Sequence, residues 1–185
     1  LFGLTEKLSI LSEESKAIHE RIESYEDAKK EAFLETFHGI DNQFQEIFEK
    51  LSAGTGELHL EDMDDPFSGG LTMMAKPRDK PLQRLNAMSG GEKSLTALSF
   101  IFAIQRYSPA PFYALDEIDA FLDASNAELV GELLDELAIG TQFIVVSHRS
   151  ALLERSERAI GVVMQENNIS AVTGISLTTE ANILS

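Results

Sequence analysis

The chain of 185 residues contains no cysteine and no tryptophan. Without cysteine it can form neither a disulfide framework nor a thiolate metal site. It has no secretory hydrophobic segment, and no apolar run reaches the length needed to cross a bilayer. We therefore expect a cytoplasmic protein with no membrane partner. At 185 residues it is long enough for one globular domain with an extension, and its apolar fraction of 43% is ordinary for a soluble protein.

Basic residues are scarce as well, with 15 Lys and Arg against 31 Asp and Glu and a formal net charge of −16. Nucleic-acid binding requires clustered Lys and Arg to neutralise phosphates, so the composition argues against direct DNA contact by this stretch. Two explanations of the acidic surface remain open. It favours solubility, or it reflects a salty cytoplasm in which screening removes the self-repulsion.

Proline is absent from the first 51 residues, which predict an almost continuous helix with two heptad seams. The first seam predicts the end of a coiled coil over 1–32. The second, rich in Phe, predicts the same helix docking on a globular unit over 33–185. One long amphipathic surface helix is the alternative. A coiled coil needs a partner strand, and none lies in this chain. The seams are Leu4, Leu8, Leu11, Ser15, Ile18, Ile22 and Tyr25, then Phe33, Phe37, Ile40, Phe44, Ile47 and Leu51.

The remaining residues alternate between strand and helix patterns, which predicts an α/β fold with a mainly parallel sheet and flanking helices. Ser125, followed three residues later by Glu128, is the expected N-cap of one of these helices. The expected elements are a hairpin at 57–63 and 71–75, helices at 89–106, 125–137 and near 151–154, and strands at 112–116, 142–147, 159–165 and 169–177, with a turn at 167–168.

The apolar strand at 112–115 ends in Asp116 and Glu117. Charges at the carboxyl end of such a strand lie in the crevice where α/β folds bind ligands. Asp116 there suits a magnesium ion, and Glu117 suits the polarisation of a water aligned with a γ-phosphate. A strand that simply ends in exposed acids is the alternative.

Two further motifs are modest when taken alone. Ser89-Gly90-Gly91 at a helix start forms a backbone nest that favours an anion, or only a glycine-rich helix cap. In the second case Glu92 is a favourable acidic first-turn residue and Lys93 a solvated lysine. His148 follows strand 142–147, where it either donates to a phosphoryl oxygen or is a polar turn residue.

The order of these motifs within about sixty residues is more specific than any one of them. Residues 85–93 resemble the signature motif of ATP-binding-cassette ATPases, 112–117 resemble Walker B, 119–123 the D-loop and 147–149 the switch histidine. No Gly-x-x-x-x-Gly-Lys-[Ser/Thr] loop is present, so the chain looks like half of an ATPase. Glu92-Lys93 and the stretch 116–120 are similar to SMC (structural maintenance of chromosomes) proteins of the prokaryotic, archaeal type.

The resemblance implies the C-terminal lobe of a P-loop ATPase head that an N-terminal segment of the same protein completes with Walker A. It implies ATP and Mg²⁺ as cofactors, with Asp116 on the metal, Glu117 activating water and His148 sensing the γ-phosphate. A second head would be bound through ATP. Further implications are a kleisin subunit near 159–177, DNA held by the full-length complex, and a nucleoid-associated role in chromosome condensation and segregation. The residues expected to contact nucleotide or the opposite head are Ser89, Gly90, Gly91, Glu92, Lys93, Asp119 and Asp123.

Other functions remain open from the sequence. A DNA double-strand-break repair relative of SMC shares this chemistry, although the run from Ile118 to Phe121 argues against it. A transporter nucleotide-binding domain is disfavoured by the leading coil and by Glu92. A non-catalytic coiled-coil scaffold with a remnant cassette has no need to keep both Asp116 and Glu117.

Overall fold

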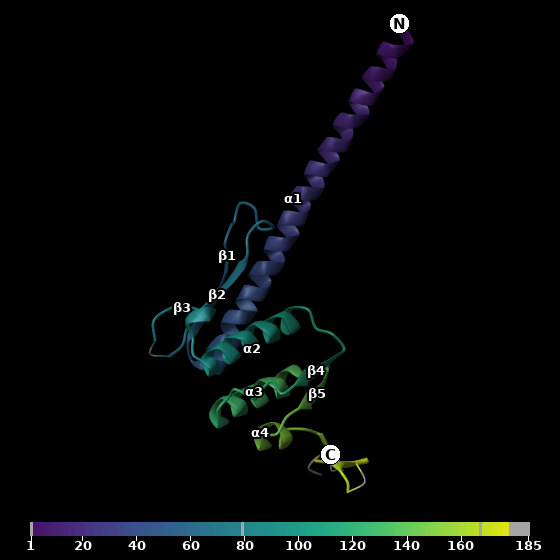
Figure 1. Ribbon diagram of the computed structural model, residues 1–185. Coiled ribbons are helices and arrows are strands. Elements are labelled where there is room, and N and C mark those ends of the chain that lie inside the picture. Colours follow the sequence, from purple (N-terminus) through teal and green to yellow (C-terminus); the bar gives the residue numbers. More distant parts are fainter. Residues whose placement is uncertain (1, 79, 167, 178–185) are drawn as a thin grey trace, which may run out of the picture.

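The computed structural model describes residues 2–78, 80–166 and 168–177. A long helix enters a helical core, and three small sheets surround or follow that core (Figure 1). The elements, in chain order, are α1 (Phe2–Ser52), β1 (Thr55–Leu60), β2 (Leu71–Lys76), β3 (Gln83–Arg84), the 3₁₀ turn η1 (Leu85–Ala87), α2 (Gly90–Tyr107), β4 (Phe112–Asp116), α3 (Ala124–Leu137), β5 (Gln142–Val146), α4 (Ser150–Leu153), β6 (Arg158–Met164) and β7 (Ser170–Ser176).

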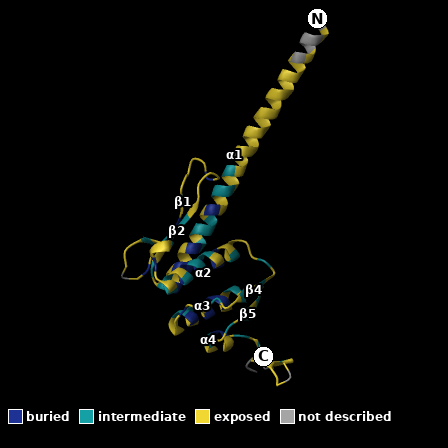
Figure 2. Cartoon of the chain, viewed as in Figure 1, coloured by how far each residue is buried: buried dark blue, intermediate teal, exposed yellow. Residues whose placement is uncertain are grey.

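Helix α1 changes its surroundings along its length, as the two seams predict. Its N-terminal part projects away from the core and is exposed, whereas its C-terminal part has one buried face (Figure 2). Ile18 and Tyr25 of the first seam are 57% and 72% exposed, while Phe44 and Ile47 of the second are fully buried. The side chains of Leu4 and Leu8 lie outside the described residues. Within the described part of the chain, no helix is long and apolar enough to span a membrane.

The core forms where the end of α1 packs against α2 and β1. Gly39 permits this close approach, because a Cβ atom there would lie 2.2 Å from Cε2 of Tyr107. Phe102 of α2 is fully buried, and Val130 brings α3 into the same cluster. Ion pairs connect the helices at the edge of the core: Nζ of Lys50 on α1 lies 2.6 Å from a carboxylate oxygen of Glu136 on α3.

The sheets combine one parallel pair with two antiparallel ones. Strands β4 and β5 pair in parallel, with Asp116 opposite Val146, as expected for strands at 112–116 and 142–147. The first sheet, in the order β1-β2-β3, is antiparallel, and so is the β6–β7 pair. Parallel pairing in the described residues is therefore confined to β4 and β5, because the segments before α2 and after α4 fold back as hairpins. Asn167 of the expected 167–168 turn lies outside the described residues.

The expected N-cap of α3 is wrong. Asp123, not Ser125, occupies the cap, and its carboxylate accepts a 2.8 Å hydrogen bond from the backbone N–H of Asn126. Either side chain could cap a helix, but the loop after β4 places Asp123 in the extended conformation that the cap position requires. Ser125 therefore lies inside the first turn.

Two strand faces carry exposed apolar side chains. On β4 and β5 the outward residues include Phe112, Ile144 and Val146, which are 50–59% exposed. On the β6–β7 hairpin nearly every residue is exposed on both faces, Ile160 and Val172 among them. A parallel sheet is normally covered on both faces. The β4–β5 sheet is covered on only one of its two faces.

Candidate functional site

The end of strand β4 places two adjacent carboxylates at an open edge of the fold. Asp116 is the last residue of the strand and is exposed. Glu117 follows in the left-handed region, with φ of 47°, and its N–H donates to the carbonyl of Val146 at 2.9 Å. A non-glycine residue at positive φ is uncommon and is held there by its surroundings. The reversal turns the Glu117 side chain out of the strand and toward β5.

His148 meets Glu117 at this edge. Its Nε2 lies 3.4 Å from Oε1 of Glu117, although the two residues are 31 positions apart in the sequence, with α3 and β5 between them. Because β4 and β5 run parallel, their carboxyl ends share one edge, which brings the two side chains together. Both are open to solvent, with the imidazole 86% and the carboxylate 57% exposed.

Asp119 faces inward. Its side chain is 3% exposed, and its Oδ2 accepts a 2.5 Å hydrogen bond from the hydroxyl of Ser147. The same Ser147 oxygen accepts from the N–H of Arg149 at 2.9 Å, and Nε of Arg149 lies 4.0 Å from Oδ2 of Asp119. Its carboxylate is thus engaged within its own chain in this structure, and a contact of Asp119 with a nucleotide or a second head stays a prediction.

The Ser89-Gly90-Gly91 stretch lies at the exposed start of α2. Gly90 has open space where a Cβ atom would stand, and at Gly91 such an atom would lie 3.5 Å from the carbonyl oxygen of Phe121. The start of α2 therefore lies beside the 119–123 loop, although about thirty positions separate them in the sequence. Ser89 is exposed and not buried in its own core. Such a helix start, with free backbone approach, suits an anion.

Glu92 caps this helix start instead of offering its carboxylate to a ligand. Its Oε2 accepts from both the N–H and the hydroxyl of Ser89, at 3.1 and 2.6 Å, and its Oε1 lies 2.7 Å from Nζ of Lys80. The hydrogen bond from Lys80, followed by that from Ser89, lowers the pKa of Glu92 from 4.5 to about 2. Glu92 is thus a carboxylate with both oxygens occupied, which matches the structural alternative considered for it.

The two remaining residues of the predicted site, Lys93 and Asp123, take no part in the contact between Glu117 and His148. Lys93 is exposed on the first turn of α2. Asp123 is the N-cap of α3, and both of its carboxylate oxygens are engaged by Asn126, at 2.8 and 3.3 Å. Neither contacts Glu117 or His148 in any interaction that the described residues make.

The donor set fits magnesium only in part. Asp116 supplies a carboxylate oxygen, the kind of ligand that Mg²⁺ prefers, and the ion usually keeps waters and takes substrate phosphates besides. Among the described residues no group of three His, Asp or Glu side chains could hold a metal ion. A magnesium site here therefore needs ligands beyond this chain, from a phosphate or from another segment.

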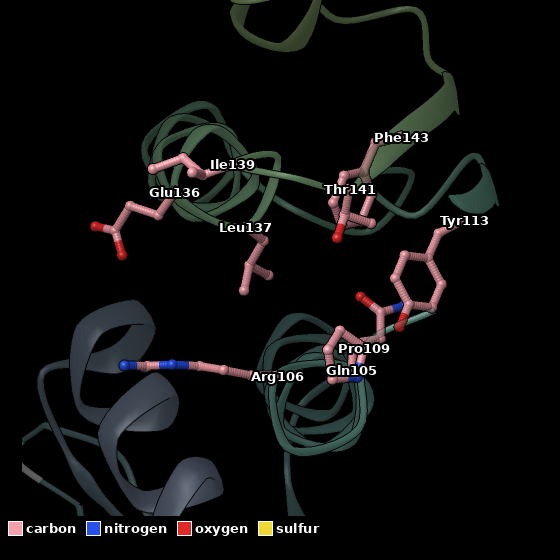
Figure 3. Close-up of a pocket in the computed structure, with 9 residues that line it drawn as sticks. All are labelled: Gln105, Arg106, Pro109, Tyr113, Glu136, Leu137, Ile139, Thr141 and Phe143. Carbon is pink, nitrogen blue, oxygen red and sulfur yellow. The ribbon is translucent and has the colours of Figure 1, made fainter. Parts of the chain in front are cut away.

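A cavity of about 220 Å³ lies at the opposite ends of the same strands (Figure 3). It is lined by the stacked rings of Tyr113 and Phe143, by Ile139, and by Arg106 and Glu136 from two helices. Asp116 and Val146 mark the other ends of β4 and β5. The cavity is therefore separate from the Glu117–His148 edge.

Sequence reasoning missed two contacts at the site. Lys80 lies between β2 and β3, and its bond to Glu92 spans twelve positions without any periodic signal. The bond from Ser147 to Asp119 joins the 119–123 and 147–149 motifs, which lie apart in the sequence. The presence of a hydroxyl next to His148 and of an acid two residues after Glu117 was the available signal.

Comparison with known proteins places this geometry in context. Residues 5–171 match the family described as RecF/RecN/SMC N terminal domain. The chromosome partition protein Smc of Gloeobacter violaceus is 50% identical over 179 residues, which cover 97% of this chain and 15% of that protein. The chain thus spans about 15% of the length of that relative.

Solved structures agree in sequence and shape. One is the Smc head domain of Pyrococcus furiosus with an extended coiled coil, bound to the C-terminal domain of ScpA. It superposes on this chain with a TM-score of 0.90 at 46% sequence identity, and the match covers 95% of this chain and 44% of that one. A structure described under ATP-driven dimerization and DNA stimulated activation of SMC ATPases has a TM-score of 0.74 at 48% sequence identity. The match covers 80% of this chain and 90% of that one. Bacterial and archaeal relatives both occur. The α/β lobe and the projecting helix match the fold of these SMC head structures, and the chain belongs to the SMC family.

Proposed function

We propose that this chain is the C-terminal half of an SMC ATPase head, preceded over 1–32 by the end of its coiled coil. Together with an N-terminal half that carries Walker A, it binds and hydrolyses ATP, and so engages and releases pairs of heads in chromosome condensation and segregation. The observation that carries this proposal is the 3.4 Å approach of Glu117 and His148 at an edge that lacks a phosphate loop.

The chain's own residues take distinct parts in this reaction. Asp116 holds the magnesium ion, which neutralises charge on the transferring phosphoryl group. Glu117 orients and polarises the attacking water, and His148, beside it, donates a hydrogen bond toward a phosphoryl oxygen. Ser89, Gly90 and Gly91 face the nucleotide of a second head, with the backbone N–H groups of Gly90 and Gly91 as the donors.

The uncovered face of the β4–β5 sheet supports the proposal that an N-terminal half completes the head. The outward face of β4 and β5, with Phe112, Ile144 and Val146, is the uncovered side of a parallel sheet. A segment that adds strands or a layer here buries those side chains and brings its phosphate loop to the strand ends. The isolated chain is therefore inactive, and it becomes an ATPase only in the complete head.

Further partners follow from similarity. The structure of the Pyrococcus furiosus head includes the C-terminal domain of ScpA. In this chain a kleisin subunit of that kind docks on the exposed β6–β7 hairpin, within 159–177. DNA is held by the full-length, nucleoid-associated complex in the cytoplasm, since a net charge of −16 does not favour DNA contact by this half.

The test uses the complete head, formed from this chain and an N-terminal segment with Walker A. Glu117→Gln is expected to lower ATP turnover by roughly 10²- to 10⁴-fold, because the polarising carboxylate is lost. ATP-dependent dimers should still form and persist on gel filtration. Ser89→Arg should leave nucleotide binding unchanged and prevent those dimers.

Each variant tests a different proposed role. Normal hydrolysis by Glu117→Gln would remove the role given to Glu117. Unchanged dimerisation of Ser89→Arg would show that the glycine nest does not act on a second head. A complete head that neither binds nor hydrolyses ATP would favour a non-catalytic scaffold.

A further inference from the structure

The side chain of His148 is poorly supported for a group that has to meet a phosphoryl oxygen. It is 86% exposed, and its partner is the carboxylate of Glu117, itself 57% exposed. An exposed side chain of this kind moves freely between rotamers. Its approach to Glu117 therefore depends on where the backbone on either side of it is held.

That backbone is anchored on both sides by one buried group. Ser147, before the histidine, donates its hydroxyl hydrogen to Oδ2 of Asp119 at 2.5 Å, and its oxygen accepts from the N–H of Arg149 at 2.9 Å. The guanidinium of Arg149, after the histidine, lies 4.0 Å from the same Asp119 oxygen. Both neighbours of His148 are thus tied to a carboxylate that is 3% exposed.

The anchor is rigidly linked to the strand end that carries Glu117. Asp119 lies two residues after Glu117 in a tight turn, in which the N–H of Ala120 donates to the carbonyl of Glu117 at 3.1 Å. The N–H of Glu117 is in turn bonded to Val146, just before Ser147. Two links therefore hold the 117–120 turn against the 146–149 turn, one through backbone and one through Asp119.

From this geometry we infer that Asp119 and Ser147 are positioning residues that hold His148 toward Glu117. The inference rests on the proposed function. Each acts through the backbone on either side of His148, because Ser147 and Arg149 are both tied to Asp119. The Asp119 carboxylate, buried with a charge-assisted hydrogen bond from a hydroxyl, is costly to leave unpaired, which keeps the link closed.

The experiment is a double-mutant cycle in the complete head. Ser147→Ala removes the link and is expected to lower kcat by roughly 10- to 100-fold, because misplacing a reacting group by about 1 Å costs on that order. The KM for ATP should stay unchanged. Ser147→Thr, which keeps the hydroxyl, should restore most of the rate. Ser156→Ala, whose hydroxyl bonds only to the carbonyl of Leu153 on a remote turn, is the matched control.

The decisive measurement is Ser147→Ala in a His148→Ala background. If Ser147 acts through His148, the second substitution should add less than about 2-fold to the loss. A full additional loss there, or a normal rate in Ser147→Ala alone, would overturn the inference while leaving the proposed function intact. A normal rate in His148→Ala alone would instead remove the proposed role of His148, and this inference with it. ATP-dependent dimerisation in the Glu117→Gln background confirms that each variant still binds nucleotide.

Discussion

Glu117 is the residue at which local backbone geometry and proposed chemistry meet. A φ of 47° costs a residue with a Cβ roughly 1–2 kcal/mol, so the fold must supply enough to keep it. The bond from its N–H to Val146 and the turn that Asp119 anchors provide this support. The unfavourable conformation is what directs a strand-end carboxylate toward the neighbouring strand.

The pair of Lys80 and Glu92 gives a residue-scale prediction about pH. The pKa of Glu92 lies at about 2 instead of 4.5, chiefly because Lys80 donates a hydrogen bond to it and then because Ser89 does. A lowered pKa means that the pair stabilises the fold fully above pH 4.5. That stabilisation is lost as the pH falls from 4.5 to about 2.

Lys80→Met should therefore raise the pKa of Glu92 toward 4.5, as followed by NMR titration of its carboxyl carbon. Lys93→Met, which removes an exposed lysine from the same helical turn, is the control and should leave it low. An unchanged titration midpoint in Lys80→Met would show that Lys80 is not the main cause.

At the scale of elements, α1 is one helix with two environments. The side chain of Phe44 is completely buried, whereas that of Ile18 is 57% exposed, although both belong to heptad seams. The exposed seam is suited to a second helix, because apolar side chains at heptad spacing are the contacts of a coiled coil. The buried seam is already satisfied by α2 and β1.

Substitutions along α1 should separate these environments. Phe44→Ala should lower the free energy of unfolding by about 3–5 kcal/mol, because it leaves a cavity in a closed core. Ile18→Ala should change it by no more than about 0.5 kcal/mol. Urea titration followed by circular dichroism measures both. Equal effects would mean that the two seams have the same environment in solution.

The start of α3 provides another element-scale prediction. Asp123→Ala should cost about 1 kcal/mol of unfolding free energy, because the N–H of Asn126 loses its acceptor. Asp123→Ser should retain most of the stability, and Ser125→Ala should be nearly neutral. The reverse order in urea titrations would assign the cap to Ser125 after all.

Much of the fold follows from local sequence patterns, and the departures have physical causes. The docking of Phe44 and Ile47 was predictable, because helical periodicity alone brings them onto one face. The strand ends at Asp116 and Val146 were predictable within a residue. The choice between Asp123 and Ser125 was not, since two good capping residues lie within one turn and the preceding loop decides between them.

The site was predictable in its parts and less so in its connections. Spacing and order brought Glu117 and His148 together correctly as neighbours. The inward turn of Asp119 and the bond from Lys80 to Glu92 depend on contacts between separate loops, which no periodic pattern encodes. Those two contacts give Asp119 and Glu92 partners within the chain, and their predicted contacts with a nucleotide or a second head stay predictions.

At the scale of the whole molecule, the β4–β5 sheet is covered on one face and uncovered on the other. The outer face of β4 and β5 predicts where an N-terminal half binds. Ile144→Glu should leave the stability of this chain within about 0.5 kcal/mol, because the side chain is already exposed. It should abolish co-elution with the N-terminal segment on gel filtration, because a buried unpaired charge is costly at an interface.

Ile139→Glu, at a residue that is 86% exposed beyond the end of α3, is the matched control and should not affect co-elution. If the Ile144→Glu variant still co-elutes with the segment, the uncovered face is not the site of assembly.

The continuity of α1 has a mechanical consequence. No break separates its projecting part from the part locked against α2, so the two rotate as one rod. About 30 residues beyond the core form an arm of about 45 Å at 1.5 Å per residue, and a 5° tilt at its base sweeps the tip through about 4 Å. Small adjustments of the lobe are thereby magnified at the far end of a stiff lever.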